Sequence, residues 1–172
     1  MKLLPFALLL LLTGCQHTPS PTPTKVSSVT VTPPQPGSAS WNLNAGDSFL
    51  QANAARAGVV TTASGLQYQV LESGPAGRAP TRSDTVKVHY RGTLTDGTVF
   101  DSSIDRGVPA TFGVGQVIPG WTEALQLMKP GDKWMLFIPS RLAYGERAMG
   151  DKIPANSTLI FRVELLDIVG AG

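Results

Sequence analysis

The segment that most limits the possible folds of this chain is a short amphipathic stretch between Gly115 and Gly131. After Pro119-Gly120, apolar residues recur at i, i+3, i+4 and i+7, as one face of a helix requires, namely Trp121, Ala124, Leu125 and Met128. Pro130-Gly131 then ends the pattern. A helix of roughly eight to ten residues is not stable alone in water, so its apolar face must lie on a larger structure. Because the surrounding sequence has strand patterns, we predict a short helix packed on a β-sheet.

The sequence on both sides of this helix alternates apolar and polar residues, which is typical of strands with one buried face. About five strands are predicted, at 65–71, 86–94, from Val99, at 133–139 and at 159–168. The run 133–139 is apolar on both faces, so it should be a central strand. Together with the helix these strands predict an antiparallel α+β domain over residues 65–170.

Two local patterns add detail to this sheet. Asp96-Gly97 between two strands predicts a two-residue hairpin turn, because such turns favour residues that accept positive φ. His89 falls on the polar face of its strand with Lys87 and Arg91. We therefore interpret it as a solvated or edge histidine rather than a catalytic one.

The N-terminus has the pattern of an export signal. Lys2 precedes an apolar run of about ten residues, which is signal-peptide length and falls short of the roughly 20 residues that a spanning helix needs. The run ends in Leu12-Thr13-Gly14-Cys15, which resembles the lipobox of bacterial lipoproteins, and Cys15 is the only cysteine of the chain. We predict a signal peptide at 1–14 and a lipidated Cys15; the alternative is a plain exported protein with an unmodified thiol. By the same resemblance, Gln16 after the cysteine favours a lipid anchor in the outer membrane of a bacterial envelope, facing the periplasm.

Residues 15–40 are rich in Pro, Thr and Ser and show no periodicity. Such a segment cannot bury enough apolar surface to fold, so we predict a disordered tether. Residues 41–64 predict a short helical connector, in which Asn44, Gly46 or Asp47 caps a helix that starts at Ser48 and ends before Gly58. No clear apolar stripe defines its packing partner. The alternative is that it is the remnant of a dimerisation arm.

Charge and residue types exclude several function classes. A formal net charge of +2, from 14 basic and 12 acidic residues without a basic cluster, gives no reason to expect nucleic acid as a partner. No Gly-rich phosphate loop follows a strand, the domain has no cysteine, and its single histidine has no clustered metal-type neighbours. We expect no metal and no other cofactor. Any activity must then come from a shaped apolar pocket.

Several motifs resemble, in the same order, those of the FKBP-type peptidyl-prolyl isomerases. They are Val88-His89-Tyr90-Arg91-Gly92-Thr93-Leu94, Asp96-Gly97, Phe100-Asp101-Ser102-Ser103, Val117-Ile118-Pro119-Gly120-Trp121, Ala143-Tyr144-Gly145 and Ile153-Pro154. The match runs from Leu66 to Ile168 without large gaps, and 62–68 further resembles the macrophage infectivity potentiator branch. The resemblance implies a curved antiparallel sheet of about five strands wrapped on the short helix. It also implies an enzyme that isomerises X-Pro bonds in exported proteins without covalent chemistry.

The resemblance implies a role for each pocket residue. The residues with an implied catalytic role are Asp101, Tyr90, Phe100 and Tyr144. Those with an implied role in substrate binding are Val117, Ile118, Trp121, Phe112, Ile153, Phe161 and Arg106. Trp121 would form the floor, and Asp101 would face the substrate amide with Arg106 and the Tyr90 hydroxyl as partners. The Ile118 N–H and the Tyr144 hydroxyl would hold carbonyl oxygens of the substrate.

The resemblance also implies the partners. They are proline-containing polypeptides and macrolide-type ligands, with the membrane contacted through the lipid anchor. We expect a monomer, because the long dimerisation arm of the branch is reduced here to 44–57. Two departures bear on ligand preference: Ala110 stands where many relatives carry an aromatic wall residue, and the loop 146–152 is more charged than usual. The rival hypothesis is a tethered chaperone-like or adaptor module that uses the same pocket with little catalysis.

Overall fold

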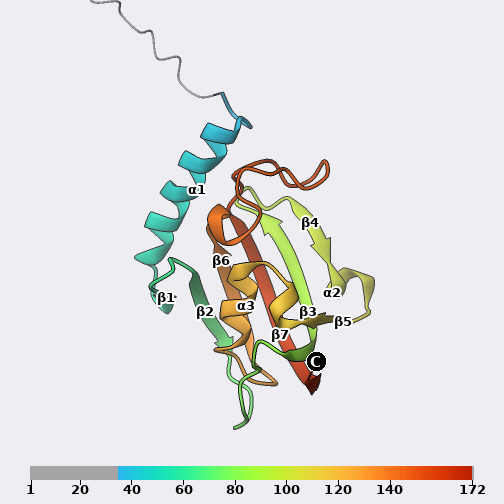
Figure 1. Ribbon diagram of the computed structural model, residues 1–172. Helices are drawn as coiled ribbons and strands as arrows, with labels where there is room; N and C mark the ends of the chain where they lie inside the picture. The colour runs from blue at the N-terminus through green and yellow to red at the C-terminus, as the bar shows by residue number, and fades with distance from the viewer. Residues whose placement is uncertain (1–34, 172) are drawn as a thin grey trace, which may run out of the picture. The chain divides into compact units, whose positions relative to one another are not determined.

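A computed structural model describes residues 35–171, so the predicted signal peptide, Cys15 and most of the predicted tether lie outside the described residues. Seven antiparallel strands form one sheet in the order β1-β2-β6-β7-β3-β4, and β5 pairs with the other end of β3 (Figure 1). The strands are β1 (Val59–Thr61), β2 (Gln67–Glu72), β3 (Asp84–Leu94), β4 (Val99–Ser102), β5 (Ala110–Gly113), β6 (Lys133–Ile138) and β7 (Leu159–Ala171). The helices are α1 (Ala39–Ala54), α2 (Ser103–Arg106) and α3 (Pro119–Leu125), with 3-10 turns η1 (Val114–Gln116) and η2 (Ser140–Leu142). In this part of the chain no helix has both the length and the apolar character needed to cross a membrane.

The predicted antiparallel α+β fold is confirmed, but the sheet has seven strands rather than about five. The two additional strands, β1 and β5, have only three and four residues. Strands this short show no alternation that a sequence could reveal. β6 is central, as its apolar pattern predicted, because it pairs with β2 on one side and with β7 on the other.

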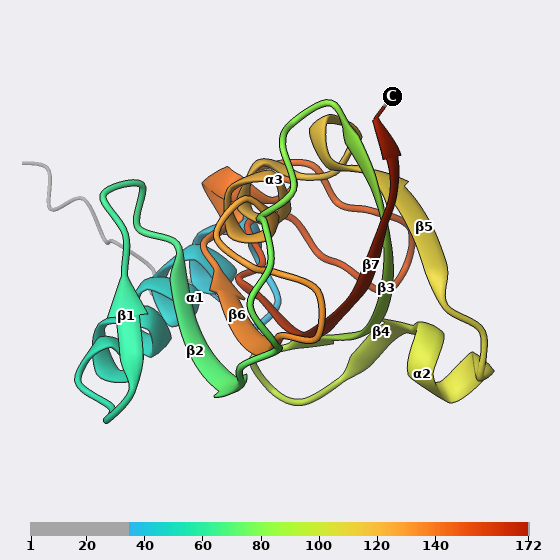
Figure 2. The same cartoon turned by 90° about the horizontal axis from the view of Figure 1, so that it is seen from below.

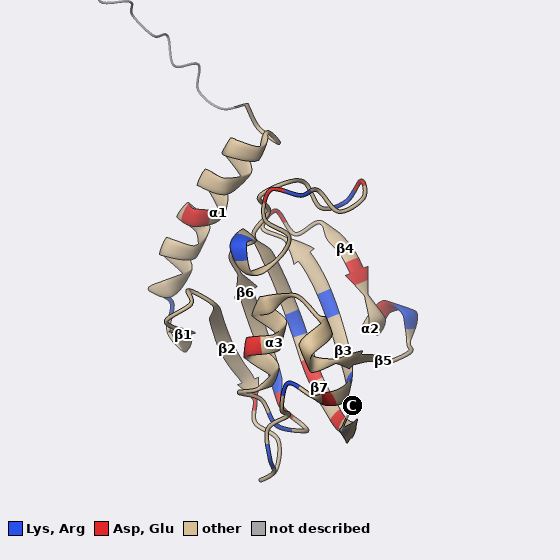
Figure 3. Cartoon of the chain, in the orientation of Figure 1, with Lys and Arg blue, Asp and Glu red and all other residues tan. Residues whose placement is uncertain are grey.

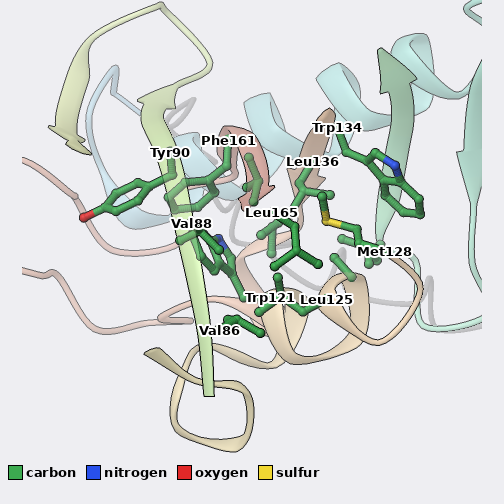
Figure 4. Close-up of a cluster of buried hydrophobic side chains, with 14 of the residues drawn as sticks. Val86, Val88, Tyr90, Trp121, Leu125, Met128, Trp134, Leu136, Phe161 and Leu165 are labelled. Carbon is green, nitrogen blue, oxygen red and sulfur yellow. The ribbon is translucent and has the colours of Figure 1, made fainter. Parts of the chain in front are cut away.

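The core lies between the curved sheet and α3, which the sheet wraps (Figure 2). Figure 4 shows Trp121, Leu125 and Met128 beside side chains that come from the sheet, and each of these three is at most 4% exposed. The helix itself ends at Leu125, earlier than the predicted stripe. The N–H groups of Leu127 and Met128 both donate to the Ala124 carbonyl (2.9 and 3.1 Å), so a tight turn brings Met128 into the core.

The β3–β4 hairpin differs from the predicted two-residue turn. The Leu94 N–H donates to the Thr98 carbonyl (2.9 Å), which leaves a three-residue loop. Gly97 has a φ of +88°, while Asp96 is not among the residues with positive φ. The Asp96 carboxylate instead accepts a hydrogen bond from the Thr98 N–H (2.8 Å). One residue with positive φ suits a three-residue hairpin, whereas a type I′ turn needs two.

Helix α1 begins at Ala39, inside the predicted tether, and its cap is not in the predicted 44–47 segment. Ser38 caps it, since the Ser38 hydroxyl accepts a hydrogen bond from the Trp41 N–H (3.3 Å). Serine is a favoured N-cap residue, but a tether rich in Ser and Thr offers many such caps. The helix carries one charged residue, Asp47 (Figure 3).

The packing partner of α1, which the sequence left undefined, is the sheet at β2 and β6. Asn53 donates a side-chain hydrogen bond to Gln67 (2.8 Å), and the Gln67 amide donates to the Leu50 carbonyl (2.9 Å). The rings of Phe49 and Phe137 lie 6.0 Å apart. Phe137 alternates along β6 with Leu136 and Ile138, which belong to the core cluster around α3. Helix α1 therefore covers the opposite face of the sheet.

Replacing Gly46 by leucine is expected to displace α1 from the domain. A Cβ at this position would lie 2.3 Å from the Thr158 hydroxyl oxygen, closer than two such atoms can approach. Overpacking of this kind typically costs about 1–3 kcal/mol of unfolding free energy, and urea unfolding measures it. The matched control is Ser48→Leu, at an exposed position of the same helix. Equal losses of unfolding free energy in the Gly46 and Ser48 variants would show that the Gly46 contact does not hold α1 on the domain.

Candidate functional site

A pocket of about 800 Å³ opens beside α3 on the concave face of the sheet. It is bordered by β3, β4, β5, β7 and the loop that precedes β7. Its lining residues are Tyr90, Phe100, Asp101, Phe112, Gln116, Val117, Ile118, Trp121, Tyr144, Met149, Gly150, Asp151, Lys152, Ile153 and Phe161. The pocket therefore collects residues that are far apart in the sequence.

The base of the pocket is aromatic. Trp121, on the first turn of α3, is 4% exposed. Three rings stand edge-on to its indole, those of Phe161, Tyr90 and Phe112, with centroid distances of 5.2, 5.4 and 5.8 Å and interplanar angles of 84° or 85°. Such edge-to-face pairs are a favoured aromatic geometry. They form an apolar cup with a rigid shape.

One wall of the cup carries a charged cluster of three side chains from three elements. The Asp101 carboxylate, on β4, accepts hydrogen bonds from the Tyr90 hydroxyl on β3 and from the Arg106 guanidinium on α2. The second Arg106 nitrogen donates to the Tyr90 hydroxyl oxygen (3.2 Å), and the guanidinium carbon lies 5.9 Å from the Tyr90 ring centroid. The Asp101 side chain stays 43% exposed. The carboxylate is thus fixed in orientation and accessible from the pocket.

This cluster holds its two titrating groups in defined protonation states. Partial burial favours the neutral form of Asp101, but the hydrogen bonds from Tyr90 and Arg106 outweigh it and lower the pKa of the carboxyl. Burial, and then the hydrogen bond to Asp101, raises the pKa of Tyr90. Asp101 is therefore an anion and Tyr90 a neutral phenol across the neutral pH range.

Two residues that the sequence did not single out hold the walls of the pocket in place. Ser103 is fully buried, and its hydroxyl accepts a hydrogen bond from the Tyr90 N–H (2.8 Å), which ties β3 to the segment that carries Asp101. A Cβ at Gly92 would lie 2.5 Å from the Phe100 ring and 2.7 Å from the Phe161 ring, so both rings pack directly on the backbone. Both residues stand in motifs that carry the family resemblance, but their roles could not be predicted, because each depends on contacts between separate elements.

Ile118 and Tyr144 both line the pocket and carry polar groups, a backbone N–H and a hydroxyl. Ile118 is the N-cap of α3, and its carbonyl accepts hydrogen bonds from the N–H groups of Trp121 and Thr122 (2.9 and 3.1 Å). Among the described residues, its own N–H has no hydrogen-bond partner. Tyr144 lies half-buried after η2 and lines the same pocket.

The rim of the pocket is a tight turn within the loop 143–158. The Met149 N–H donates to the Ile153 carbonyl (2.8 Å) and the Ile153 N–H donates back to Met149 (3.3 Å). Gly150 has a φ of +58°, which suits the turn between them. Asp151 and Lys152 are exposed at this turn and place one charge of each sign over the pocket.

The structure brings together all eleven of the pocket residues predicted from the sequence. Ten of them line the pocket, and Arg106 adjoins it through Asp101. The prediction omitted Gln116, Met149, Gly150, Asp151 and Lys152. His89 lies outside the lining and is half-buried, with Nδ1 3.1 Å from the Ser103 hydroxyl oxygen. Ala110 is half-buried opposite Val88 and does not line the pocket.

Within residues 35–171, no group of three or more His, Cys, Asp or Glu is placed to hold a metal ion.

Comparison with known proteins gives two family matches and close relatives. Residues 76–166 match the family described as FKBP-type peptidyl-prolyl cis-trans isomerase, and residues 34–70 match the domain amino terminal to that isomerase. The chain is 60% identical over 127 residues to the FKBP-type peptidyl-prolyl cis-trans isomerase FkpA of Aeromonas hydrophila, covering 74% of this chain and 47% of FkpA. It is 54% identical over 127 residues to the outer membrane protein MIP of Legionella longbeachae, covering 74% of this chain and 54% of MIP.

A solved structure matches over nearly its whole length. The crystal structure of a peptidyl-prolyl cis-trans isomerase from Pseudomonas syringae pv. tomato aligns with a TM-score of 0.70 and 37% identity, covering 76% of this chain and 96% of that one. In contrast, the chain spans about half the length of the two curated relatives above.

Proposed function

The chain belongs to the family of FKBP-type peptidyl-prolyl cis-trans isomerases, and on this basis we propose that it accelerates cis/trans isomerisation of X-Pro bonds in exported polypeptides. The single observation that carries the proposal is the aromatic cup over Trp121 with the fixed Asp101 carboxylate at its wall. The cup has room for a proline ring, and the carboxylate faces the space where the preceding amide would lie. This pairing of apolar shape with one oriented anion supports binding of an X-Pro unit.

The mechanism follows from the physics of the amide bond. Rotation about X-Pro meets a barrier of about 18–20 kcal/mol because twisting destroys amide resonance. The twisted amide has less charge separation than the planar one, so an apolar cup favours it relative to water. The Ile118 N–H and the Tyr144 hydroxyl would hold flanking carbonyl oxygens in the bent geometry. The chain only stabilises the twisted form: no covalent bond is made or broken, and no cofactor takes part.

A refolding experiment tests this proposal on a polypeptide rather than a short peptide. The probe is a denatured protein whose slow refolding phase is limited by X-Pro isomerisation, which takes tens to hundreds of seconds without a catalyst. Catalytic amounts of the chain should shorten the slow phase and leave the fast phases unchanged. If the chain binds the unfolded probe but does not shorten this slow phase, the adaptor hypothesis replaces the hypothesis that the chain is an isomerase.

The rate of isomerisation should be independent of pH between about 5 and 9. The pKa of Asp101 lies below its usual value near 3.9 and that of Tyr90 above its usual value near 10, so neither group titrates in this window. Because the folded state lowers the pKa of Asp101, its contribution to stability is present above the unfolded pKa and is lost as the pH falls through the folded pKa. A pH–rate profile with an uncharged peptide tests whether the isomerisation rate is independent of pH. A change of this rate between pH 5 and 9 that is absent in Asp101→Asn would contradict the prediction.

We also propose that the chain is lipidated at Cys15 and anchored in the outer membrane, facing the periplasm. We further propose that it is a monomer and that macrolide-type ligands bind in the same pocket. The lipobox-like Leu12-Thr13-Gly14-Cys15 supports the anchor, and the match to an outer membrane protein of Legionella longbeachae supports the envelope location.

Cys15→Ser should release the chain from the membrane fraction or leave its signal peptide uncleaved. Cell fractionation and the mass of the N-terminal peptide measure both effects. Gln16→Ser is the matched control and should leave the chain membrane-bound. A Cys15→Ser chain that is normally processed and still membrane-bound would rule out the anchor.

A further inference from the structure

A second, smaller cavity lies between the first turns of α1, the β3–β4 hairpin and the loop that precedes β7 (Figure 1). Two side-chain hydrogen bonds hold this loop on α1: Asn42 donates to the Ala155 carbonyl (2.9 Å), and Asn156 donates to the Ala39 carbonyl (3.2 Å). The cavity has a volume of about 250 Å³. Pockets for small-molecule ligands usually measure roughly 300–1,000 Å³, so this cavity suits a single side chain better than a separate ligand.

The apolar part of this cavity is built around an exposed tryptophan. Trp41 is 40% exposed, whereas the other two tryptophans of the chain are 4% and 5% exposed. Pro36, Leu94 and Pro154 line the cavity beside it. Burial in the core therefore does not account for Trp41, and the cavity offers an aromatic surface to an incoming apolar stem.

The polar part of the cavity is one carboxylate. Among the described residues that line it, Asp96 alone is charged, and none of the ion pairs within residues 35–171 involves Asp96. The hydrogen bond from the Thr98 N–H (2.8 Å) lowers the pKa of Asp96, so the group is an anion at neutral pH. Other polar side chains of the lining already bond within the chain, as Asn42 does to Ala155 and Ser157 to the Pro154 carbonyl (2.7 Å).

A side chain that suits both parts has an apolar stem and a cationic head. Lysine and arginine have this form, since their methylene groups can lie on apolar surface while the charged end stays in water. A cation is attracted to the face of an indole as well as to a carboxylate. The cavity is thus complementary to a basic side chain in shape and in charge.

The two cavities adjoin each other in one loop. Ile153 lines the substrate pocket, and the next residue, Pro154, lines the second cavity. Each residue of an extended polypeptide spans roughly 3.3–3.6 Å. A polypeptide with its proline over Trp121 can therefore place a residue a few positions away at the second cavity.

We propose that the cavity between Trp41 and Asp96 is a client subsite, which binds a lysine or arginine side chain located a few residues from the proline that is isomerised. This inference rests on the proposed function of the substrate pocket. The chain would then act preferentially on exported polypeptides in which a basic residue lies near an X-Pro bond.

The test compares peptides that differ at one position. Each peptide has one X-Pro bond and carries lysine, norleucine or glutamate about two to five residues before or after the proline, a range set by the reach of an extended chain. NMR exchange gives kcat/KM with the full-length chain in detergent solution. At the best position, lysine should be about three- to tenfold better than norleucine, as one exposed ion pair and one cation–π contact allow, and this advantage should shrink at high salt. Glutamate is the opposite-charge control, because the N-terminus of α1 by itself would favour an anion.

A matched pair of variants assigns the advantage of lysine to the cavity. Asp96→Asn removes the charge but leaves an oxygen that can accept the Thr98 N–H, and the ratio of kcat/KM for lysine over norleucine should fall to about one, because the ion pair is lost. Asp47→Asn removes the same charge from an exposed position of α1 outside the cavity and should keep the advantage. In the parent chain the lysine peptide, but not the norleucine peptide, should also shift the indole NMR signal of Trp41.

Several outcomes would overturn the inference. Equal acceleration of the three peptides, or an advantage of glutamate, would remove the subsite and leave the proposed function standing. A lysine advantage that survives in Asp96→Asn, or falls equally in Asp47→Asn, would show that the cavity is not its source. If no peptide is accelerated, the proposed function fails, and the Trp41 indole then decides the inference alone: the absence of a shift with the lysine peptide would overturn it as well.

Discussion

Asp101→Ala is expected to lower kcat/KM for X-Pro isomerisation by about ten- to a hundredfold while the domain stays folded. Hydrogen bonds to charged groups contribute about 1.5–3 kcal/mol, and each 1.36 kcal/mol of lost transition-state stabilisation is tenfold in rate. The substitution also frees the Tyr90 hydroxyl and the Arg106 guanidinium, which Asp101 now orients. Because the side chain is 43% exposed, its removal leaves no buried cavity.

Asp105→Ala is the matched control for this prediction. Asp105 lies in the same short helix as Arg106, but its carboxylate is exposed, does not line the pocket, and lies 3.8 Å from an Arg91 nitrogen. Exchange rates of an X-Pro peptide, with near-UV circular dichroism of both variants, decide the outcome. Equal activity of the Asp101 and Asp105 variants would remove the carboxylate from the mechanism.

Trp121→Ala is expected to lose most of the activity and about 3–5 kcal/mol of unfolding free energy. Truncation of a buried tryptophan removes its burial energy and leaves a cavity, and Trp121 is 4% exposed with three rings packed against it. A domain with a total stability of about 5–15 kcal/mol can unfold in part after such a loss. Urea unfolding therefore has to accompany the activity measurement.

A pair of milder variants separates the two effects of Trp121. Trp121→Phe and Trp134→Phe shorten two buried tryptophans by similar amounts. Trp134 is 5% exposed and stacks on Tyr68 with a centroid distance of 4.3 Å, away from the pocket. Both variants should lose similar stability, but only Trp121→Phe should lose activity, by several-fold or more. A parallel loss of activity in both would mean that Trp121 acts through stability alone.

Much of the fold and of the site was predictable because it depends on patterns within single segments. The alternation of apolar and polar residues at 86–94 predicts β3, and the apolar face of Trp121, Ala124 and Leu125 predicts a helix packed on a sheet. Burial of one face imposes a repeat of two residues on a strand and of about 3.6 residues on a helix. The pocket residues followed from the order of short motifs over 66–168, which resembles one family. No single residue among them would have been assigned a role by its type alone.

The parts that were not predictable depend on contacts between distant segments or on a choice among several possible local hydrogen bonds. The docking of α1 uses the close approach of Gly46 to Thr158 and the Asn53–Gln67 hydrogen bond, which leave no periodic signal. The start of α1 depends on which of several serines and threonines becomes the cap. The hairpin loop has three residues, closed by the bond between Leu94 and Thr98, and the Asp96 side chain bonds to the Thr98 N–H within it. The positioning roles of Ser103 and Gly92 likewise appear only when separate elements are brought into contact.

The measurement that tests the central claim most directly is NMR exchange of a short X-Pro peptide in the presence of the chain labelled at its tryptophan indoles. The central claim is that the proline lies over Trp121 while its bond isomerises. Acceleration of exchange together with a shift of the Trp121 indole signal, and none at Trp134, is the predicted result. Acceleration without a shift at Trp121, or a shift without acceleration in the folded chain, would contradict the account.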